Sequence, residues 1–286
     1  MKHKAAVVQM VSGGDVHANL RSAAGLIGQA REQGADLILL PENFAVLDGG
    51  PLSQFAERQG DTAALLQGFL QEQARSTGAW LIAGSMPLST RPSRHGTSPE
   101  AVPGGRVRPA CMVYDPEGRL VARYDKMHLF DVQVEDRQEQ YSESRSFEPG
   151  DESVCVQTPA GCIGLSICYD LRFPELYRRL LEQGAQVLTV PSAFTKVTGE
   201  AHWEVLLRAR AIENQCYVLA ANQGGVHNAT RETWGHSMIV DPWGRILASV
   251  ESGPGVAVAE LDLEALTALR ARMPIQSHRR FRDGLC

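Results

Sequence analysis

Three residues with reactive side chains each stand at the end of an apolar, strand-like segment of the sequence: Glu42, Lys126 and Cys168. In α/β sheets, functional side chains gather beyond the carboxyl ends of the strands, so these three side chains are candidates for one site. A carboxylate can take the proton of a thiol, and the thiolate can attack a carbonyl or nitrile carbon. An ammonium group can stabilise the oxyanion that then develops. The set therefore indicates a cysteine-dependent hydrolase.

Each of these residues also has a purely structural interpretation, and the spacing along the chain does not link them. A glutamate after a strand is commonly a solvated or capping residue, and a lysine beside an aspartate is commonly a surface residue. A cysteine in an apolar run often only fills space in the core. A second catalytic arrangement is a cysteine–histidine dyad, in which Cys168 pairs with His128 or His202. The residues alone leave these alternatives open.

The sequence around Cys168 predicts that the thiol lies between a buried strand and a helix. Residues 162–167 form an apolar run that ends at the cysteine, and Pro174 opens a helical pattern shortly afterwards. Backbone N–H groups near the start of a helix stabilise negative charge. A thiol at this position is therefore suited to act as a nucleophile.

The two halves of the chain repeat one order of predicted elements, which is strand, helix, strand, helix, strand and hairpin. The sequence Gln-Gly-Ala precedes a short apolar run at 33–40 and again at 183–190, and both hairpins carry the turn sequence Asp-Pro-x-Gly-Arg. Asp15 and Asp61 are predicted to cap the first two helices.

This repeat favours an α/β fold in which two sheets pack face to face with helices outside. That arrangement is a four-layer α-β-β-α sandwich with internal pseudo-twofold symmetry. No linker separates the halves, so we expect one domain over residues 1–286. Its core would extend from about residue 4 to residue 262, and the C-terminal tail 263–286 would pack on the domain or on a second subunit.

The composition is that of an ordinary globular protein, with 43% hydrophobic and 21% charged residues among 286. The net charge is −5 and no basic tract occurs, which argues against nucleic acid or an anionic membrane as a partner. No apolar run is long enough to span a membrane, and residues 1–11 are interpreted as a strand rather than a signal peptide. The six cysteines include no C-x-x-C pair, which argues against a zinc site or a disulfide framework and favours a reducing cytoplasm.

Three segments of the sequence resemble the nitrilase superfamily of carbon–nitrogen hydrolases. They are LLPEN at 39–43, YDKMHLFD at 124–131 and ICYDLRFPE at 167–175, in the order and with a spacing compatible with that family. The resemblance covers nearly the whole chain. It implies a four-layer fold, a catalytic triad of Glu42, Lys126 and Cys168, homodimers or larger homo-oligomers, and no cofactor or metal.

Many members of this family carry a second glutamate that supports the lysine and the substrate. The segment 141–150 resembles the part of the family sequence that contains it, so the resemblance implies that role for Glu143.

The C-terminal half resembles the deaminated-glutathione amidase branch of nitrilase-like proteins. The segments that carry this resemblance are 198–218, 235–244 and 276–280. The ω-amidase branch shares the Ala-His-Trp-Glu element at 201–204, but it generally differs in the run that follows and in the tail.

These observations together predict a cytoplasmic enzyme that hydrolyses a linear amide through a thioester. The resemblance implies that it converts deaminated glutathione to 2-oxoglutarate and cysteinylglycine, a reaction of metabolite repair. A backbone N–H near Tyr169 would help Lys126 to hold the oxyanion, Arg172 would bind the keto acid end, and Phe194 and Thr195 would line the pocket. The alternatives are an ω-amidase acting on 2-oxoglutaramate, another amidohydrolase or nitrilase of the family, and a binding protein without catalytic activity.

Overall fold

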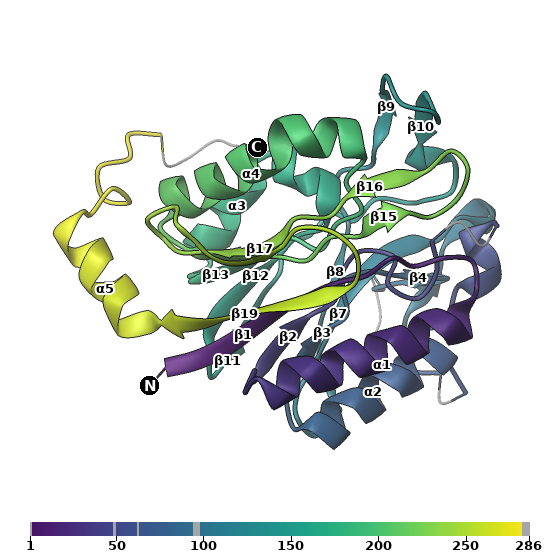
Figure 1. The fold of residues 1–286 in the computed structure, drawn as a ribbon, viewed down its shortest axis with the longest axis horizontal. Helices are drawn as coiled ribbons and strands as arrows, with labels where there is room; N and C mark the ends of the chain where they lie inside the picture. The colour runs from purple at the N-terminus through teal and green to yellow at the C-terminus, as the bar shows by residue number, and fades with distance from the viewer. Residues whose placement is uncertain (1, 48–49, 62, 94–97, 282–286) are drawn as a thin grey trace.

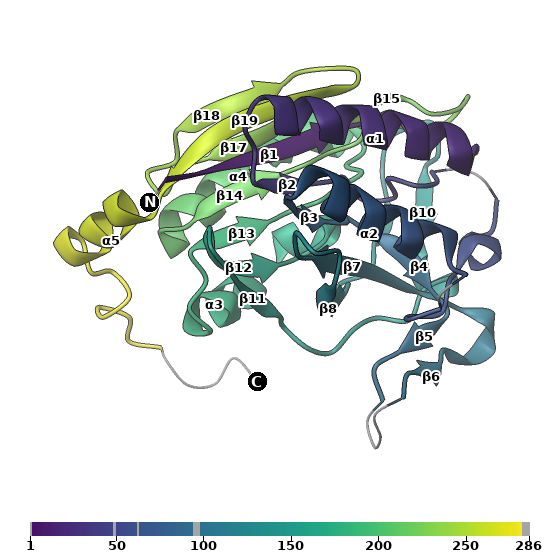
Figure 2. The ribbon, with the colours of Figure 1, turned by 90° about the horizontal axis from the view of Figure 1, so that it is seen from below.

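Two β-sheets pack face to face in the computed structural model, and helices cover the outer face of each sheet (Figures 1 and 2). The structure describes residues 2–47, 50–61, 63–93 and 98–281. Buried apolar clusters join the helices to the sheets and the sheets to each other. The predicted four-layer α-β-β-α sandwich is confirmed.

The first sheet contains seven strands: β1 (Lys2–Gln9), β2 (Leu37–Leu39), β3 (Trp80–Ile82), β4 (Met86–Leu88), β7 (Arg108–Tyr114), β8 (Leu120–Asp125) and β19 (Gly255–Asp262). Its centre is parallel, because β1 pairs with β2 and β2 with β3 in the same direction. The strands β19 and β7 extend this centre in antiparallel orientation, and β4 and β8 both pair with β7.

The second sheet contains six strands: β11 (Cys155–Thr158), β12 (Gly161–Leu165), β13 (Val187–Thr189), β14 (Tyr217–Ala220), β17 (Ser237–Val240) and β18 (Ile246–Val250). Here β12, β13 and β14 are parallel, and β17 joins β14 in antiparallel orientation. This is the pairing of β1, β2, β3 and β7 in the first sheet. The repeat read from the sequence is therefore a repeat of topology.

The helices pack their apolar faces on the two sheets. On the first sheet lie α1 (Val16–Glu32) and α2 (Leu65–Thr77), and on the second lie α3 (Pro174–Glu182) and α4 (Lys196–Asn214) (Figures 1 and 2). Leu20 and Ile27 of α1 are seven residues apart, so they lie on the same face of the helix, and both are buried. Leu207 of α4 is buried in the same way. Among the described residues, no helix combines the length and the hydrophobicity that a transmembrane span needs.

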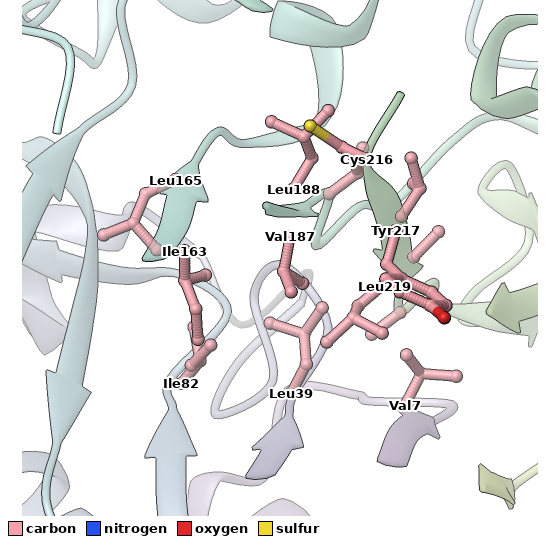
Figure 3. Packing of buried hydrophobic residues seen from close by; sticks show 14 of the residues in the cluster. Val7, Leu39, Ile82, Ile163, Leu165, Val187, Leu188, Cys216, Tyr217 and Leu219 are labelled. Atoms are coloured by element: carbon pink, nitrogen blue, oxygen red, sulfur yellow. The ribbon is translucent and has the colours of Figure 1, made fainter. Parts of the chain in front are cut away.

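The interior between the sheets follows from the alternation of side chains along each strand. Val7 and Leu39 point toward the second sheet, where they meet Val187 and Leu219 (Figure 3). Their neighbour Ile38 points to the other side and packs under α1 and α2. Each such side chain contributes roughly 1.5–3 kcal/mol by leaving water.

One predicted helix cap is confirmed and the other is wrong. Asp15 caps α1, because its carboxylate accepts a 3.0 Å hydrogen bond from the Ala18 backbone. Asp61 instead accepts from Ala63 before α2 begins, and the first N–H groups of α2 donate to the carboxylate of Glu57. A side chain from outside the helix has taken the capping role.

Shorter elements connect the layers. The small strands are β5 (Thr90–Arg91), β6 (Glu100–Ala101), β9 (Asp131–Gln133), β10 (Gln140–Ser142), β15 (Gly224–Val226) and β16 (Glu232–Trp234), and the 3₁₀ turns are η1 (Leu52–Phe55), η2 (Pro103–Gly105), η3 (Glu143–Arg145) and η4 (Cys168–Arg172). The hairpins β9–β10 and β15–β16 lie near each other at one end of the molecule (Figure 1).

The helix α5 (Leu263–Arg272) follows β19 and contacts the turns that precede β13 and β14 of the second sheet. Its Arg270 donates hydrogen bonds to the carbonyls of Ala185 and Gln215 at 2.9 and 2.8 Å. These contacts attach the first part of the tail to the body of the same chain.

Candidate active site

A buried ammonium group joins two carboxylates beyond the strand ends. The Nζ of Lys126 donates to Oε1 of Glu42 at 2.9 Å and to both carboxylate oxygens of Glu143 at 3.0 and 2.9 Å. Burial alone would lower the pKa of Lys126, but the charges of Glu143 and Glu42 hold that pKa well above its usual value. Lys126 is therefore a permanent cation in this site.

The end of β8 fixes the position of Lys126. The preceding residue, Asp125, is buried and accepts hydrogen bonds from Arg108 at 2.9 Å and from Arg123 at 2.7 Å. The backbone N–H of Lys126 donates to Pro109, and its carbonyl accepts from Gly150. The side chain thus starts from a backbone that is held on both sides.

Glu42 follows β2 and is 4% exposed. One carboxylate oxygen faces Lys126, and the other accepts a 2.9 Å hydrogen bond from the backbone N–H of Ala193. The turn that carries Glu42 is packed against Gly84, where a Cβ atom would collide with the carbonyl of Pro41. The absence of a side chain at Gly84 lets the two turns approach.

Cys168 begins η4, directly beyond the second sheet, and is 8% exposed. Its backbone lies in the left-handed region with φ of 50°, and its N–H donates to the carbonyl of Pro191 at 2.9 Å. A left-handed cysteine costs about 1–3 kcal/mol and must be held by its surroundings. The sequence predicted the strand-to-helix junction correctly but not this conformation.

Asp170 supplies much of that support from within the same turn. Its buried carboxylate accepts from the backbone N–H of Ile167 at 2.8 Å and from the hydroxyl of Tyr124 at 2.6 Å. It also bonds Nδ1 of His128 at 2.7 Å. One carboxylate therefore ties the turn of Cys168 to the segment that carries Lys126.

The thiol of Cys168 is protonated at rest. Burial, and after it the charge of Glu42, raises the pKa of the thiol well above its usual value. The charge of Lys126 and the backbone N–H of Ala193 act in the opposite direction but do not outweigh it. Formation of a thiolate here requires a base that accepts the proton.

Glu143 opens η3, and both of its carboxylate oxygens contact the ammonium of Lys126. Its carboxylate also accepts a 2.8 Å hydrogen bond from the backbone N–H of Phe130. With 22% of its side chain exposed, it is the most accessible of the residues around Lys126.

A cavity of about 300 Å³ opens above Cys168. All four residues predicted to bind substrate, Tyr169, Arg172, Phe194 and Thr195, line it together with Cys168 and Glu143. Further lining residues that the sequence did not single out are Asn43, Phe130, Tyr141, Phe147, Thr198 and Arg231. All of these except Arg231 belong to segments that resemble the family, whereas Arg231 lies just ahead of the segment 235–244.

The sequence model of the carbon-nitrogen hydrolase family matches residues 4–271, which is most of the chain. The chain belongs to the carbon-nitrogen hydrolase family. The resemblance drawn from the three segments of sequence is therefore confirmed, and a protein of this family is a hydrolase of carbon–nitrogen bonds.

Individual relatives agree with this membership over nearly the whole chain. A Yersinia enterocolitica protein named deaminated glutathione amidase is 41% identical over 281 residues, covering 98% of this chain and 94% of that one. The Synechocystis sp. protein of the same name is 44% identical over 279 residues, with 97% and 98% covered. The crystal structure of the C. elegans NitFhit protein superposes with a TM-score of 0.85 at 39% identity, covering 98% of this chain and 65% of that one.

Within this carbon-nitrogen hydrolase, both histidines of the alternative dyad are engaged by other residues. The ring of His128 bonds Asp170 and stacks on Phe173 at 3.7 Å, and His202 lies 3.2 Å from the guanidinium of Arg172. The geometry favours a carboxylate rather than an imidazole as the base for Cys168. In the described part of the chain, no group of three or more His, Cys, Asp or Glu side chains is arranged to hold a metal ion.

Proposed function

We propose that this protein is a cysteine-dependent amidase that hydrolyses deaminated glutathione to 2-oxoglutarate and cysteinylglycine through a thioester. The observation that carries the chemistry is the buried Lys126, which bridges Glu42 and Glu143 beside a cavity that ends at Cys168. The names of the relatives from Yersinia enterocolitica and Synechocystis sp. support the choice of substrate.

Acylation begins with the transfer of the thiol proton to Glu42. The thiolate of Cys168 attacks the amide carbonyl carbon, and the negative charge moves to the carbonyl oxygen. The ammonium of Lys126 and a backbone N–H near Tyr169 stabilise this oxyanion. Glu42 then protonates the leaving nitrogen, the carbon–nitrogen bond breaks, and the acyl group remains on sulfur as a thioester.

Deacylation uses the same base a second time. Glu42 accepts a proton from water, the hydroxide attacks the thioester carbon, and the thiolate that leaves recovers its proton from Glu42. Lys126 keeps its charge while Glu42 carries the proton, because the carboxylate of Glu143 remains paired with it. Glu143 positions Lys126 and contributes to the wall that the substrate contacts.

Arg172 suits the 2-oxo acid end of the substrate. Its guanidinium carbon lies 5.4 Å from the ring centroid of Phe194 and 5.8 Å from that of Tyr169, and both rings attract the cation. A planar guanidinium binds a carboxylate through two parallel hydrogen bonds. Phe194 and Thr195 would then flank the acyl chain.

Rates on three substrates test the proposal. We expect hydrolysis of deaminated glutathione to exceed that of 2-oxoglutaramate and of simple nitriles in kcat/KM. A preference for 2-oxoglutaramate would make the protein an ω-amidase, and a preference for nitriles would make it a nitrilase.

The cysteine itself is tested by the Cys168→Ala variant. It should remain folded and lose all amidase activity, and mass spectrometry of the wild type during turnover should detect the acyl group on the peptide that contains Cys168. Retained turnover in the variant would exclude this mechanism, and absence of activity in the wild type would leave a binding protein.

A homodimer is the assembly that the surface supports best. Val205 and Ile212 on the outer face of α4 are 69% and 46% exposed, and the nearby Trp243 is 57% exposed. Apolar side chains gathered in this way are typical of a subunit interface. Sedimentation analysis of a Val205→Glu variant, which should dissociate, tests this inference.

The cytoplasm is the compartment that fits the thiols. The five cysteines in the described part of the chain, Cys111, Cys155, Cys162, Cys168 and Cys216, are all free. Free thiols persist in a reducing compartment.

A further inference from the structure

The cavity above Cys168 contains a second guanidinium group that the mechanism does not use. Arg172 and Arg231 both line this cavity. Among the residues that the structure describes, neither guanidinium lies within 4.0 Å of a carboxylate, although Glu143 belongs to the same lining. The charge of Glu143 is already paired with Lys126. The cavity therefore presents two guanidinium groups that form no ion pair with a described carboxylate.

The two arginines come from different walls. Arg172 extends from η4 and contacts Tyr169, Phe194 and His202. Arg231 follows the turn of the β15–β16 hairpin and lies on the side of Tyr141, which belongs to β10. A molecule in the cavity can thus meet both guanidinium groups.

The backbone around Arg231 is well fixed for a residue in a hairpin loop. The side chain of Asn228 accepts a 2.7 Å hydrogen bond from the N–H of Arg231, and the carbonyl of Arg231 accepts from His227 at 3.0 Å. Arg137 of the β9–β10 loop reaches across to the carbonyl of Ala229. The two hairpins hold each other, so Arg231 starts from a defined position over the cavity.

Deaminated glutathione carries a charge at each end. Its 2-oxo acid carboxylate lies on the acyl side of the scissile amide, and its glycine carboxylate ends the leaving dipeptide. The loss of the amino group leaves a dianion without a compensating cation. Two extended residues span about 7 Å, so the glycine carboxylate would lie several ångströms from the Cys168 sulfur and toward the mouth of the cavity.

We propose that Arg231 binds the terminal carboxylate of the leaving dipeptide and that the site thereby selects amides with a carboxylate on both sides of the scissile bond. The inference rests on the proposed function, because it concerns the part of the substrate that departs as cysteinylglycine. An amide with a single carboxylate, such as 2-oxoglutaramate, would engage Arg172 and leave Arg231 unused. Arg231 is then the residue that separates the two substrates.

The test compares deaminated glutathione with an analogue whose glycine carboxylate is converted to an amide. The wild type should hydrolyse the acid with a kcat/KM about 10- to 100-fold above that of the amide, the usual effect of one charge-assisted hydrogen bond. In the Arg231→Gln variant this preference should fall to about onefold, mainly through a higher KM for the acid. Arg231→Lys should restore part of the preference, because the charge returns without the planar fork.

Arg145→Gln is the matched control, since it removes one positive charge from an exposed side chain next to Ser146 of the cavity lining, and Arg145 itself does not belong to that lining. It should keep the preference for the acid. If this control lost the preference to the same extent as Arg231→Gln, the effect would come from the overall positive charge near the cavity. That result would overturn the assignment of Arg231.

The wild type alone can also overturn it. Equal kcat/KM for the acid and the amide would exclude any recognition of the terminal carboxylate, whatever the stability of the variants. Failure of the wild type to hydrolyse either compound is a different outcome, since it would remove the proposed function and the assignment with it.

Discussion

Both carboxylate oxygens of Glu143 lie within hydrogen-bond distance of the ammonium of Lys126, at 3.0 and 2.9 Å. Glu42 offers only one of its oxygens to the same group and gives the other to the backbone of Ala193. The two glutamates are therefore not equivalent. Glu143 holds the lysine from two atoms, and Glu42 keeps an oxygen whose only hydrogen-bond partner among the described residues is the neutral N–H of Ala193.

This difference predicts how a Glu143→Gln variant behaves. A carboxamide cannot accept at both atoms, so Lys126 should shift toward Glu42 and the oxyanion should lose part of its stabilisation. We expect kcat to fall about 10- to 100-fold, less than for the loss of a donor that contacts the oxyanion directly. Glu135→Gln, an exposed change on the β9–β10 hairpin, is the control and should not alter kcat. An unchanged kcat for Glu143→Gln would show that the second glutamate has no part in positioning.

Replacement of Lys126 by methionine should destabilise the fold. The change leaves two carboxylates facing each other, one of them buried, without a cation between them. Removal of one partner from a buried ion pair costs about 3–5 kcal/mol, which urea unfolding will measure. Lys196→Met removes an exposed lysine paired with Glu232 and should cost at most about 1 kcal/mol. Equal midpoints for the two variants would contradict the prediction.

Asp170→Asn should lower both stability and turnover. An amide nitrogen in place of one carboxylate oxygen cannot accept from Ile167, Tyr124 and His128 together, so at least one buried group loses its partner. We expect a loss of about 2–3 kcal/mol and a fall in kcat, because the strained turn of Cys168 relaxes. Asp115→Asn loosens a surface hairpin turn in a comparable way and should reduce stability without a change in kcat. A normal kcat in Asp170→Asn would show that turnover does not depend on the support that Asp170 gives to the turn of Cys168.

We expect the free energy of unfolding to fall at alkaline pH because buried thiols must lose protons when the chain unfolds. Burial raises the pKa of Cys111 to about 12 and that of Cys216 to about 12, from 9.0. Between pH 9 and 12 the unfolded chain therefore binds fewer protons than the folded one, and the free energy of unfolding falls as pH rises. Each thiol contributes a slope of about 1.4 kcal/mol per pH unit.

Urea unfolding at a series of pH values above 9 measures this slope. Cys111→Ala should make it shallower by about 1.4 kcal/mol per pH unit. A slope that is the same in Cys111→Ala and in the wild type would assign the alkaline sensitivity to other groups.

The sequence predicted the parts of the site that lie at strand ends. Short apolar runs mark the ends of β2 and β12 locally, and within each sheet the parallel pairing places the carboxyl ends of the central strands on the same side. For this reason Glu42 and Cys168 could be predicted as site residues from the sequence. The left-handed backbone of Cys168 was not, because it is imposed by Asp170 and Pro191 and not by the residues next to it.

Only part of the cavity rim could be predicted from the sequence, because Tyr141 lies in the segment 141–150 that resembles the family whereas Arg231 lies outside every such segment. Tyr141 and Arg231 lie in polar hairpins without apolar periodicity, and they meet only because the two hairpins dock through contacts such as that of Arg137 with Ala229. The prediction that Asp61 caps α2 was wrong for a similar reason. Asp61 stood at the expected spacing, but Glu57 reached the helix start through a fold that no local pattern describes.

The apposition of the two sheets has a consequence for how the protein loses its activity. Glu42 and Lys126 extend from the first sheet, and Cys168 and Ala193 extend from the second, so the proton transfer that we propose crosses the seam between the two sheets. Turnover then reports the docking of the halves rather than the integrity of either one. A chain whose two sheets had separated along this seam would therefore be catalytically silent.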